Sequence, residues 1–157
     1  MGKLDEEVAL LRSIPMLANL PANKLKLLAF ASDQVAYSQN DILFRQGDDA
    51  DAAYIVVNGF ADVLVATGAG GGESKVAELG PNSFVGDMAI LGDMPRTATV
   101  RASTDLETLR IRKNHMMDLM RDTPDLAMEV LKELVMRLAK TTHDLSTARD
   151  EVARLRT

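Results

Sequence analysis

The chain contains no cysteine, and this absence removes several kinds of chemistry. Without thiols there is no disulfide bond, no thiolate ligand for a metal and no cysteine nucleophile. The absence also favours a reducing compartment, so the sequence predicts a cytoplasmic protein. His115 and His143 are isolated from each other, and no set of nucleophile, base and orienting residue is present. We therefore expect no metal ion and no enzymatic activity.

Long apolar runs and clusters of basic residues are also missing. No run approaches the roughly 18 apolar residues that a membrane helix needs. Asp5, Glu6 and Glu7 stand where a signal peptide would have its apolar segment. Lys and Arg total 18 against 23 Asp and Glu, for a net charge of −5, and no segment has the basic face that contacts with a phosphate backbone require. We expect neither a membrane partner nor nucleic-acid binding by this chain alone.

The composition that remains is that of a globular protein. Hydrophobic residues make up 46% and charged residues 26% of the 157 positions, which suits one domain with a real core. The pattern predicts one structural domain with three parts: an N-terminal helical segment (1–33), a strand-rich part (34–112) and a helical part (113–157). In the first part, residues 24–31 have helical spacing.

The strand-rich part is a series of short runs separated by turn residues. The predicted strands include residues 41–44, 53–57, 61–66, 74–79, 97–102 and 106–111. Asn58-Gly59 predicts a two-residue hairpin, because both residues tolerate positive φ. Residues 67–72 predict a glycine-rich hairpin tip. Short strands without long helices between them favour an antiparallel β jelly-roll barrel, so we expect an α+β fold with helices on either side.

The last part predicts a short helix (114–121) and then a long one. Thr123, Pro124 and Asp125 have the residue types of an N-cap, a first helical position and an acidic first turn. From there the helical pattern continues to Arg156, over about 33 residues or ~50 Å.

A heptad pattern runs along this long helix. Leu131, Leu138, Leu145 and Val152 lie seven residues apart, with Thr141 as a polar interruption between them. A seam of this length usually pairs with a copy of itself, which predicts a homodimer through a coiled coil. The alternative is that the distal half folds along its own barrel.

Residues 84–98 contain the most specific chemistry. Asp87 follows Gly86 at a predicted helix start, and Arg96 comes nine residues later in a proline-marked turn. Helix-start amides and a guanidinium suit a phosphate, and a carboxylate suits hydroxyl groups. The segment therefore predicts a site for a small ligand with one phosphate and a hydroxyl-bearing ring.

Three segments together resemble the cyclic-nucleotide-binding domain family, which catabolite-activator-type regulators, kinase regulatory subunits and cyclic-nucleotide-gated channels share. Arg-Gln-Gly-Asp at 45–48, followed by residues 53–59, is similar to the family's glycine turn and hairpin. Gly-Asp-Met-Ala at 86–89 resembles the start of its phosphate-binding cassette. Pro-Arg-Thr-Ala at 95–98 resembles the end of that cassette.

The resemblance implies a cyclic nucleotide ligand, either cyclic AMP or cyclic GMP. Arg96 would pair with the cyclic phosphate, and the amides of Met88 and Ala89, after Gly86, would bind its other oxygens. Asp87 would accept a hydrogen bond from the ribose 2′-hydroxyl. Most nucleotide-binding members have glutamate there, so the carboxylate of Asp87 is one methylene shorter.

The resemblance also implies residues near the base. Thr97 occupies a position whose hydroxyl contacts phosphate or a guanine amino group in some members. Thr141 and Thr142 are similar to a Thr-Ser pair that contacts adenine in the activator branch.

The predicted function is a cyclic-nucleotide sensor that couples ligand binding to rearrangement of its C-terminal dimerisation or partner helix, with a possible protein effector. The alternatives are a fragment of a DNA-binding regulator or channel, and a ligand-free dimerisation adaptor.

Overall fold

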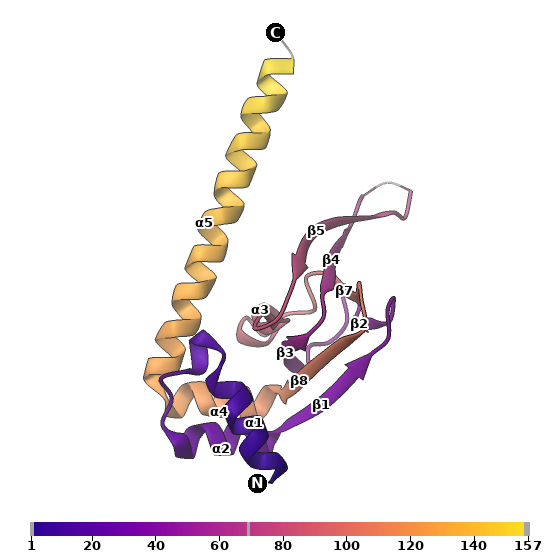
Figure 1. Ribbon diagram of the computed structural model, residues 1–157. Helices are drawn as coiled ribbons and strands as arrows, with labels where there is room; N and C mark the ends of the chain where they lie inside the picture. Colours follow the sequence, from indigo (N-terminus) through magenta and orange to yellow (C-terminus); the bar gives the residue numbers. More distant parts are fainter. Residues whose placement is uncertain (1, 69, 156–157) are drawn as a thin grey trace. The chain divides into compact units, whose positions relative to one another are not determined.

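The computed structural model describes residues 2–68 and 70–155 (Figure 1). The chain divides into two compact units, and the division falls between Leu119 and Met120. The first unit holds the N-terminal helices and all eight strands of the described residues. The grouping of both units into one domain stays a prediction.

The N-terminal segment consists of α1 (Lys3–Arg12), the 3-10 turn η1 (Pro15–Leu17) and α2 (Ala22–Ala31). Helices α1 and α2 pack against each other (Figure 1). Leu25 and Leu28 of α2 are buried, which agrees with the helical spacing in the sequence, and α2 begins two residues before the predicted start.

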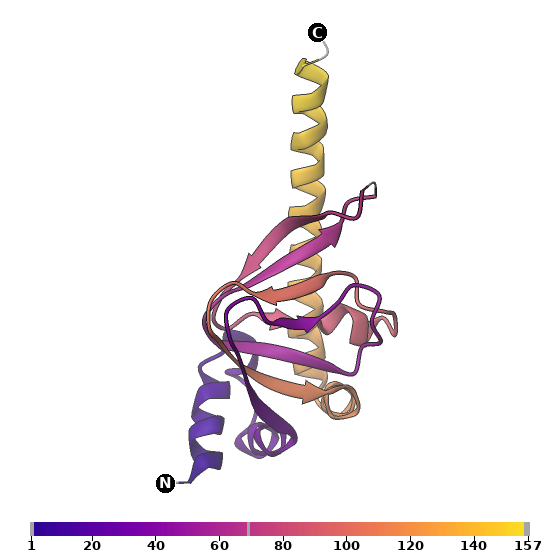
Figure 2. The same cartoon turned by 90° about the vertical axis from the view of Figure 1, so that its right-hand side faces the viewer.

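Two four-stranded antiparallel sheets follow, and they confirm the predicted jelly roll and the α+β class. The first sheet has the order β1 (Ser32–Tyr37), β8 (Leu106–Arg112), β3 (Ala52–Asn58) and β6 (Phe84–Val85). The second has the order β2 (Ile42–Phe44), β7 (Thr99–Ala102), β4 (Ala61–Ala66) and β5 (Glu73–Leu79). Figure 2 shows both sheets and the long β4–β5 ribbon.

The core lies between the two sheets. One apolar cluster contains Val56 and Leu106 from the first sheet and Val100 and Ala102 from the second. Strand β8 pairs with β1 on one side and β3 on the other, and its Leu109 is fully buried opposite Ile55. Burial of such side chains stabilises by about 1.5–3 kcal/mol each, so this central strand holds the first sheet together.

The structure corrects the hairpin predicted at Asn58-Gly59. Strands β3 and β4 do not pair; they belong to different sheets. Gly59 has φ +92, whereas Asn58 stays in β3 opposite Glu107, so the turn lacks the two positive φ values of a type I′ hairpin. Its backbone instead meets the β7–β8 loop, since the carbonyl of Phe60 accepts a hydrogen bond from Ser103 N at 2.9 Å. Asn58-Gly59 therefore carries the chain from one sheet to the other.

The hairpin predicted between β4 and β5 is confirmed by their antiparallel register. Thr67 N donates to the carbonyl of Gly72 at 2.9 Å across the tip. Residue 69 of the predicted tip lies outside the described residues. Six of the seven β5 residues, all but Leu79, are exposed.

The remaining elements are α4 (Lys113–Asp122), which crosses the division between the units, and α5 (Pro124–Leu155). Helix α5 has 32 residues and is about 48 Å long, close to the prediction, whose end at Arg156 lies outside the described residues. The hydroxyl of Thr123 is buried without a hydrogen-bond partner in the described chain, so the predicted side-chain cap does not form. Its carbonyl accepts from the amides of Leu126 and Ala127 instead. Among the described helices, none is long and apolar enough to cross a membrane.

Candidate functional site

Arg96 is the centre of the candidate site, and it is only 3% exposed. Its Nη1 donates to the carbonyl of Gly86 at 2.9 Å, and its Nη2 donates to the carbonyl of Ala52 at 2.5 Å. The guanidinium carbon lies 3.9 Å from the centroid of the Phe44 ring, which is cation–π geometry. Segments far apart in sequence therefore hold one buried cation.

The charge of Arg96 is only partly balanced. Asp51 Oδ1 lies 3.7 Å from Nη2, and its side chain is 69% exposed. Burial lowers the pKa of Arg96, while Tyr54, Asp51 and Asp48 act in the opposite direction. An arginine stays protonated in proteins, so the site keeps a buried positive charge whose counter-ion, Asp51, is largely exposed to solvent.

One donor of this guanidinium is unused. Nε of Arg96 is buried and has no hydrogen-bond partner among the described residues. A buried donor without an acceptor costs about 1–3 kcal/mol, more for a charged group. An anionic acceptor at this place would remove that cost, and a phosphate oxygen suits a guanidinium geometrically.

Gly86 allows the cassette to approach this arginine. It has φ +78 and stands between β6 and α3 (Asp87–Leu91) as the N-cap of that helix. A Cβ at Gly86 would overlap Nη1 of Arg96 and lie 3.2 Å from the Phe44 ring. Only glycine combines this left-handed backbone with such close packing. The predicted helix start after Gly86 is therefore present, and glycine is needed for its position.

The first residues of α3 differ in exposure. Asp87 is 3% exposed and lies in the first helical turn, Ala89 is buried, and Met88 is 44% exposed. The structure therefore brings Gly86, the start of α3 and Arg96 together, as the 84–98 segment predicts. Thr97 is next to Arg96 in the chain, and its side chain is exposed.

The glycine turn at 45–48 fixes the backbone of Arg96. The amide of Arg96 donates to the carbonyl of Asp48 at 2.8 Å, and the amide of Gly47 donates to the carbonyl of Arg96 at 2.8 Å. The glycine turn and Arg96 are distant in sequence, and these backbone hydrogen bonds join them. Their pairing explains why the arginine side chain is held inward.

Sequence reasoning missed Phe44, Asp51 and Ala52, all of which contact the guanidinium. Ala52 contributes only a backbone carbonyl, which no residue type could have signalled. Phe44 has the pattern of an ordinary strand residue. Asp51 stands among other acidic residues in a loop, and only the fold distinguishes it from them.

Asp51 links the arginine to a second basic group. Its Oδ2 accepts from Arg110 Nη2 at 2.9 Å, and its carbonyl accepts from the amide of Lys113. Beside this pair is an open hollow of about 620 Å³ lined by Ala50, Asp51, Arg110, Arg112, Lys113, Asn114 and Met117. The hollow borders Asp51, but its lining includes neither Arg96 nor Asp87.

The predicted base-contacting residues belong to the second unit. Thr141 and Thr142 are exposed on α5, and the hydroxyl of Thr141 donates to the carbonyl of Arg137 at 3.0 Å. Their role toward a ligand stays a prediction. In residues 2–68 and 70–155, no group of three or more His, Asp or Glu side chains could hold a metal ion.

Comparison with known proteins agrees with this geometry. Residues 34–123 match the family described as "Cyclic nucleotide-binding domain". A cAMP-dependent protein kinase regulatory subunit of Blastocladiella emersonii is 33% identical over 67% of the chain, and the chain spans 26% of that protein. The lysophospholipase NTE1 of Chaetomium globosum is 26% identical over 89% of the chain, which spans 9% of that enzyme. The chain thus corresponds to a small part of each relative.

Among solved structures, the Catabolite Activator Protein of Thermus thermophilus superposes with a TM-score of 0.75 and 28% identity, over 84% of this chain and 62% of that one. The family match spans more than half of the chain and contains the glycine turn, the cassette and Arg96. The chain belongs to the cyclic nucleotide-binding domain family.

Proposed function

We propose that this chain is a sensor for cyclic AMP or cyclic GMP. The observation that carries the proposal is the buried guanidinium of Arg96, whose Nε has no acceptor among the described residues. Family membership supports a cyclic nucleotide as the ligand. The cyclic phosphate carries one negative charge, which matches the single buried cation at the cassette.

The phosphate binds at Arg96 and the start of α3. Its oxygens accept from the guanidinium and from the amides of Met88 and Ala89, which follow Gly86 at the helix start. Charge-assisted hydrogen bonds are about twice as strong as neutral ones. Because Arg96 is already buried, binding does not require a new desolvation of the protein cation.

The ribose binds at Asp87 and the base near the threonines. Asp87 accepts from the 2′-hydroxyl, directly or through a bridging water, because its side chain is one methylene shorter than glutamate. Thr97, Thr141 and Thr142 carry the hydroxyls that would contact the phosphate or the base. Comparing cyclic AMP with cyclic GMP reports on these contacts.

The output of the sensor is the arrangement of the C-terminal helix α5. A ligand shifts a two-state equilibrium only through its differential contacts with the two states, typically about 1–3 kcal/mol of coupling. The helix then changes its pairing with a partner helix, and a protein effector detects that change. We place this non-enzymatic sensor in the cytoplasm, since the chain has no cysteine.

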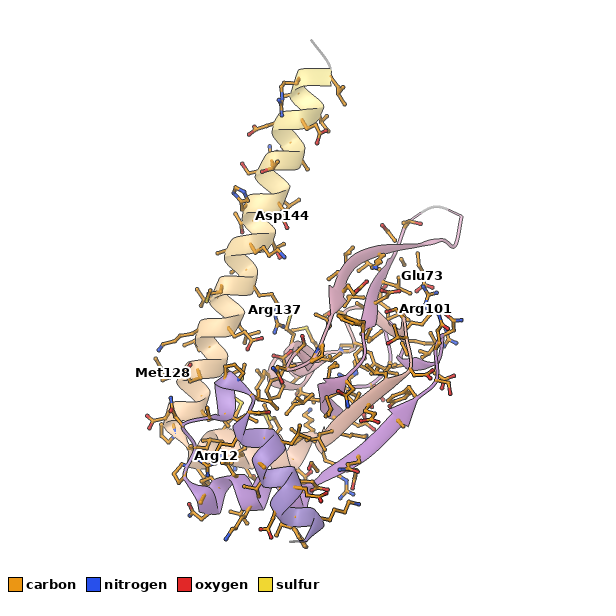
Figure 3. The ribbon with its side chains drawn as sticks, in the orientation of Figure 1. Arg12, Glu73, Arg101, Met128, Arg137 and Asp144 are labelled. Atoms are coloured by element: carbon orange, nitrogen blue, oxygen red, sulfur yellow. The ribbon has the colours of Figure 1, made fainter. Side chains whose placement is uncertain are left out.

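Titration calorimetry with cyclic AMP and cyclic GMP tests the proposal. We expect micromolar or tighter binding of at least one nucleotide by the wild type, weakened at least tenfold in Arg96→Ala and in Arg96→Lys. Arg96→Lys keeps a positive charge but lacks the planar fork, so it separates loss of geometry from loss of charge. Arg101→Ala, which changes an arginine paired with Asp62 on the second sheet (Figure 3), is the matched control and should bind as the wild type does.

Thermal unfolding of each variant establishes that it is folded before binding is measured. A folded Arg96→Ala that binds as tightly as the wild type would overturn the assignment of the phosphate site. A folded wild type that binds neither nucleotide would favour the ligand-free adaptor instead.

A further inference from the structure

Phe44 covers one face of the Arg96 guanidinium. The guanidinium carbon lies 3.9 Å from the centroid of the Phe44 ring. The same ring lies 3.2 Å from the place that a Cβ would occupy at Gly86, whose carbonyl accepts from Nη1 of Arg96. The face of an aromatic ring attracts a cation within about 6 Å, and more strongly where water is excluded. Because Arg96 is only 3% exposed, the contact with Phe44 is of the stronger kind.

An irregularity in the pairing of β2 with β7 turns Phe44 toward the arginine. Ile42 lies opposite Arg101, whereas Phe44, two residues later, lies opposite Val100, only one residue further along β7. Opposite residues share a face of a sheet, and successive residues of a strand lie on opposite faces. Val100 belongs to the buried cluster between the sheets, and Phe44 packs against that cluster. In a regular strand, Phe44 would have followed Ile42 onto the face of Arg101.

Backbone carbonyls hold the two terminal nitrogens of the guanidinium. Nη1 of Arg96 donates to the carbonyl of Gly86 at 2.9 Å, and Nη2 donates to the carbonyl of Ala52. Nε is the one guanidinium nitrogen without a hydrogen-bond partner in the part of the chain that the structure describes. The Phe44 ring and the two carbonyls therefore fix the guanidinium and leave Nε for an anionic acceptor.

Asp51 is the group that would compete for Arg96 if the ring were absent. Its Oδ1 lies 3.7 Å from Nη2, and its side chain is 69% exposed. A guanidinium that is free on one face could rotate toward this carboxylate and form a closer ion pair. A ligand would then have to break that pair and order the guanidinium again, and both steps reduce affinity.

We propose that Phe44 is a positioning residue for the anionic ligand: its ring holds the guanidinium of Arg96 in the orientation that leaves Nε free for a phosphate oxygen. A cation that is ordered before binding costs the ligand less ordering on binding. The inference rests on the proposed function for the identity of the ligand, but the hold of the ring on Arg96 does not depend on it.

Nitrogen-15 NMR of labelled arginine tests this hold without any ligand. A fixed guanidinium with separate acceptors at Nη1 and Nη2 gives separate Nη signals, whereas a rotating guanidinium averages them. We expect separate Nη signals for Arg96 in the wild type and averaged signals in Phe44→Leu, which keeps an apolar side chain but removes the ring. Nη signals of Arg96 that stay separate in a folded Phe44→Leu variant would overturn the proposal.

Titration calorimetry with cyclic AMP and cyclic GMP tests the consequence for binding. The affinity of Phe44→Leu should be about five- to tenfold lower than that of the wild type. Val63→Ala is the matched control, because Val63 on β4 packs against the same buried cluster as Phe44. It removes core packing but leaves the ring in place, so it should bind as the wild type does. A folded Phe44→Leu variant that binds no more weakly than Val63→Ala would overturn the positioning role.

The two measurements also separate this inference from the proposed function. A wild type that binds nucleotide as tightly as Phe44→Leu does, whatever the NMR signals show, overturns the positioning role and leaves the sensor standing. A wild type that binds neither nucleotide overturns the sensor, while averaged Nη signals in Phe44→Leu would still support the hold of the ring on Arg96.

Discussion

Gly86→Ala is the substitution that tests the site's geometry most sharply. Gly86 has φ +78, and a Cβ there would overlap Nη1 of Arg96 and approach the Phe44 ring. The left-handed backbone alone costs a residue with a Cβ about 1–2 kcal/mol. Displacing Nη1 also breaks its 2.9 Å hydrogen bond to the carbonyl of Gly86, and a bond to a charged group contributes about 1.5–3 kcal/mol. We expect the free energy of unfolding to fall by about 2.5–5 kcal/mol.

Gly47→Ala is the matched control. Gly47 also has a positive φ, +91, but a Cβ there would meet nothing within 4 Å. It should therefore lose only the backbone part, about 1–2 kcal/mol. Urea unfolding of both variants and the wild type measures the difference, provided that the slope against denaturant is unchanged. A Gly86→Ala variant no less stable than Gly47→Ala would refute the packing of Arg96 against the cassette.

Other parts of the first unit give further predictions. The hydrogen bond from Lys113 lowers the pKa of Asp93 below 3.8, so the stabilisation from this pair is present at neutral pH and is lost as the pH falls through the folded-state pKa. Carboxyl NMR should show the pKa of Asp93 rising in Lys113→Met. An unchanged pKa would contradict the contact. Gly59 has φ +92, and a Cβ there would overlap the carbonyl oxygen of Asp105. Gly59→Ala should therefore lower the free energy of unfolding in urea by about 2 kcal/mol or more, and a loss below about 1 kcal/mol would contradict that packing. Leu109→Ala should cost about 2–5 kcal/mol by the same assay, since Leu109 is fully buried on the central strand, and a smaller loss would argue against that core.

The sequence predicts most of the fold because its local signals agree with the tertiary structure. Short runs of β-branched and apolar residues become strands, and Pro124 starts the long helix as expected. The hairpin prediction at Asn58-Gly59 fails because distant residues decide the conformation there: Asn58 pairs with Glu107 of β8, and the β7–β8 loop donates to the carbonyl of Phe60, directly after the turn. A turn residue reports which conformations are allowed, and the packing around it selects one of them.

In the candidate site too, some features follow from the sequence and others only from the fold. Gly86 and Arg96 are found from residue type and spacing, and the structure brings them within hydrogen-bond distance. Phe44 and the carbonyl of Ala52 could not be found, because an aromatic strand residue and a backbone group carry no distinct sequence signal. Burial of Arg96 itself also depends on the fold, since a turn arginine after proline is exposed by default.

The most direct test of the central claim observes Nε of Arg96. In a protein with nitrogen-15-labelled arginine, the Nε–H signal assigned by its loss in Arg96→Lys should shift markedly when cyclic AMP or cyclic GMP is added, because this buried donor gains a phosphate oxygen. The shift should saturate with the affinity measured by calorimetry. An Arg96 Nε–H signal that stays unchanged while either nucleotide binds would contradict the account.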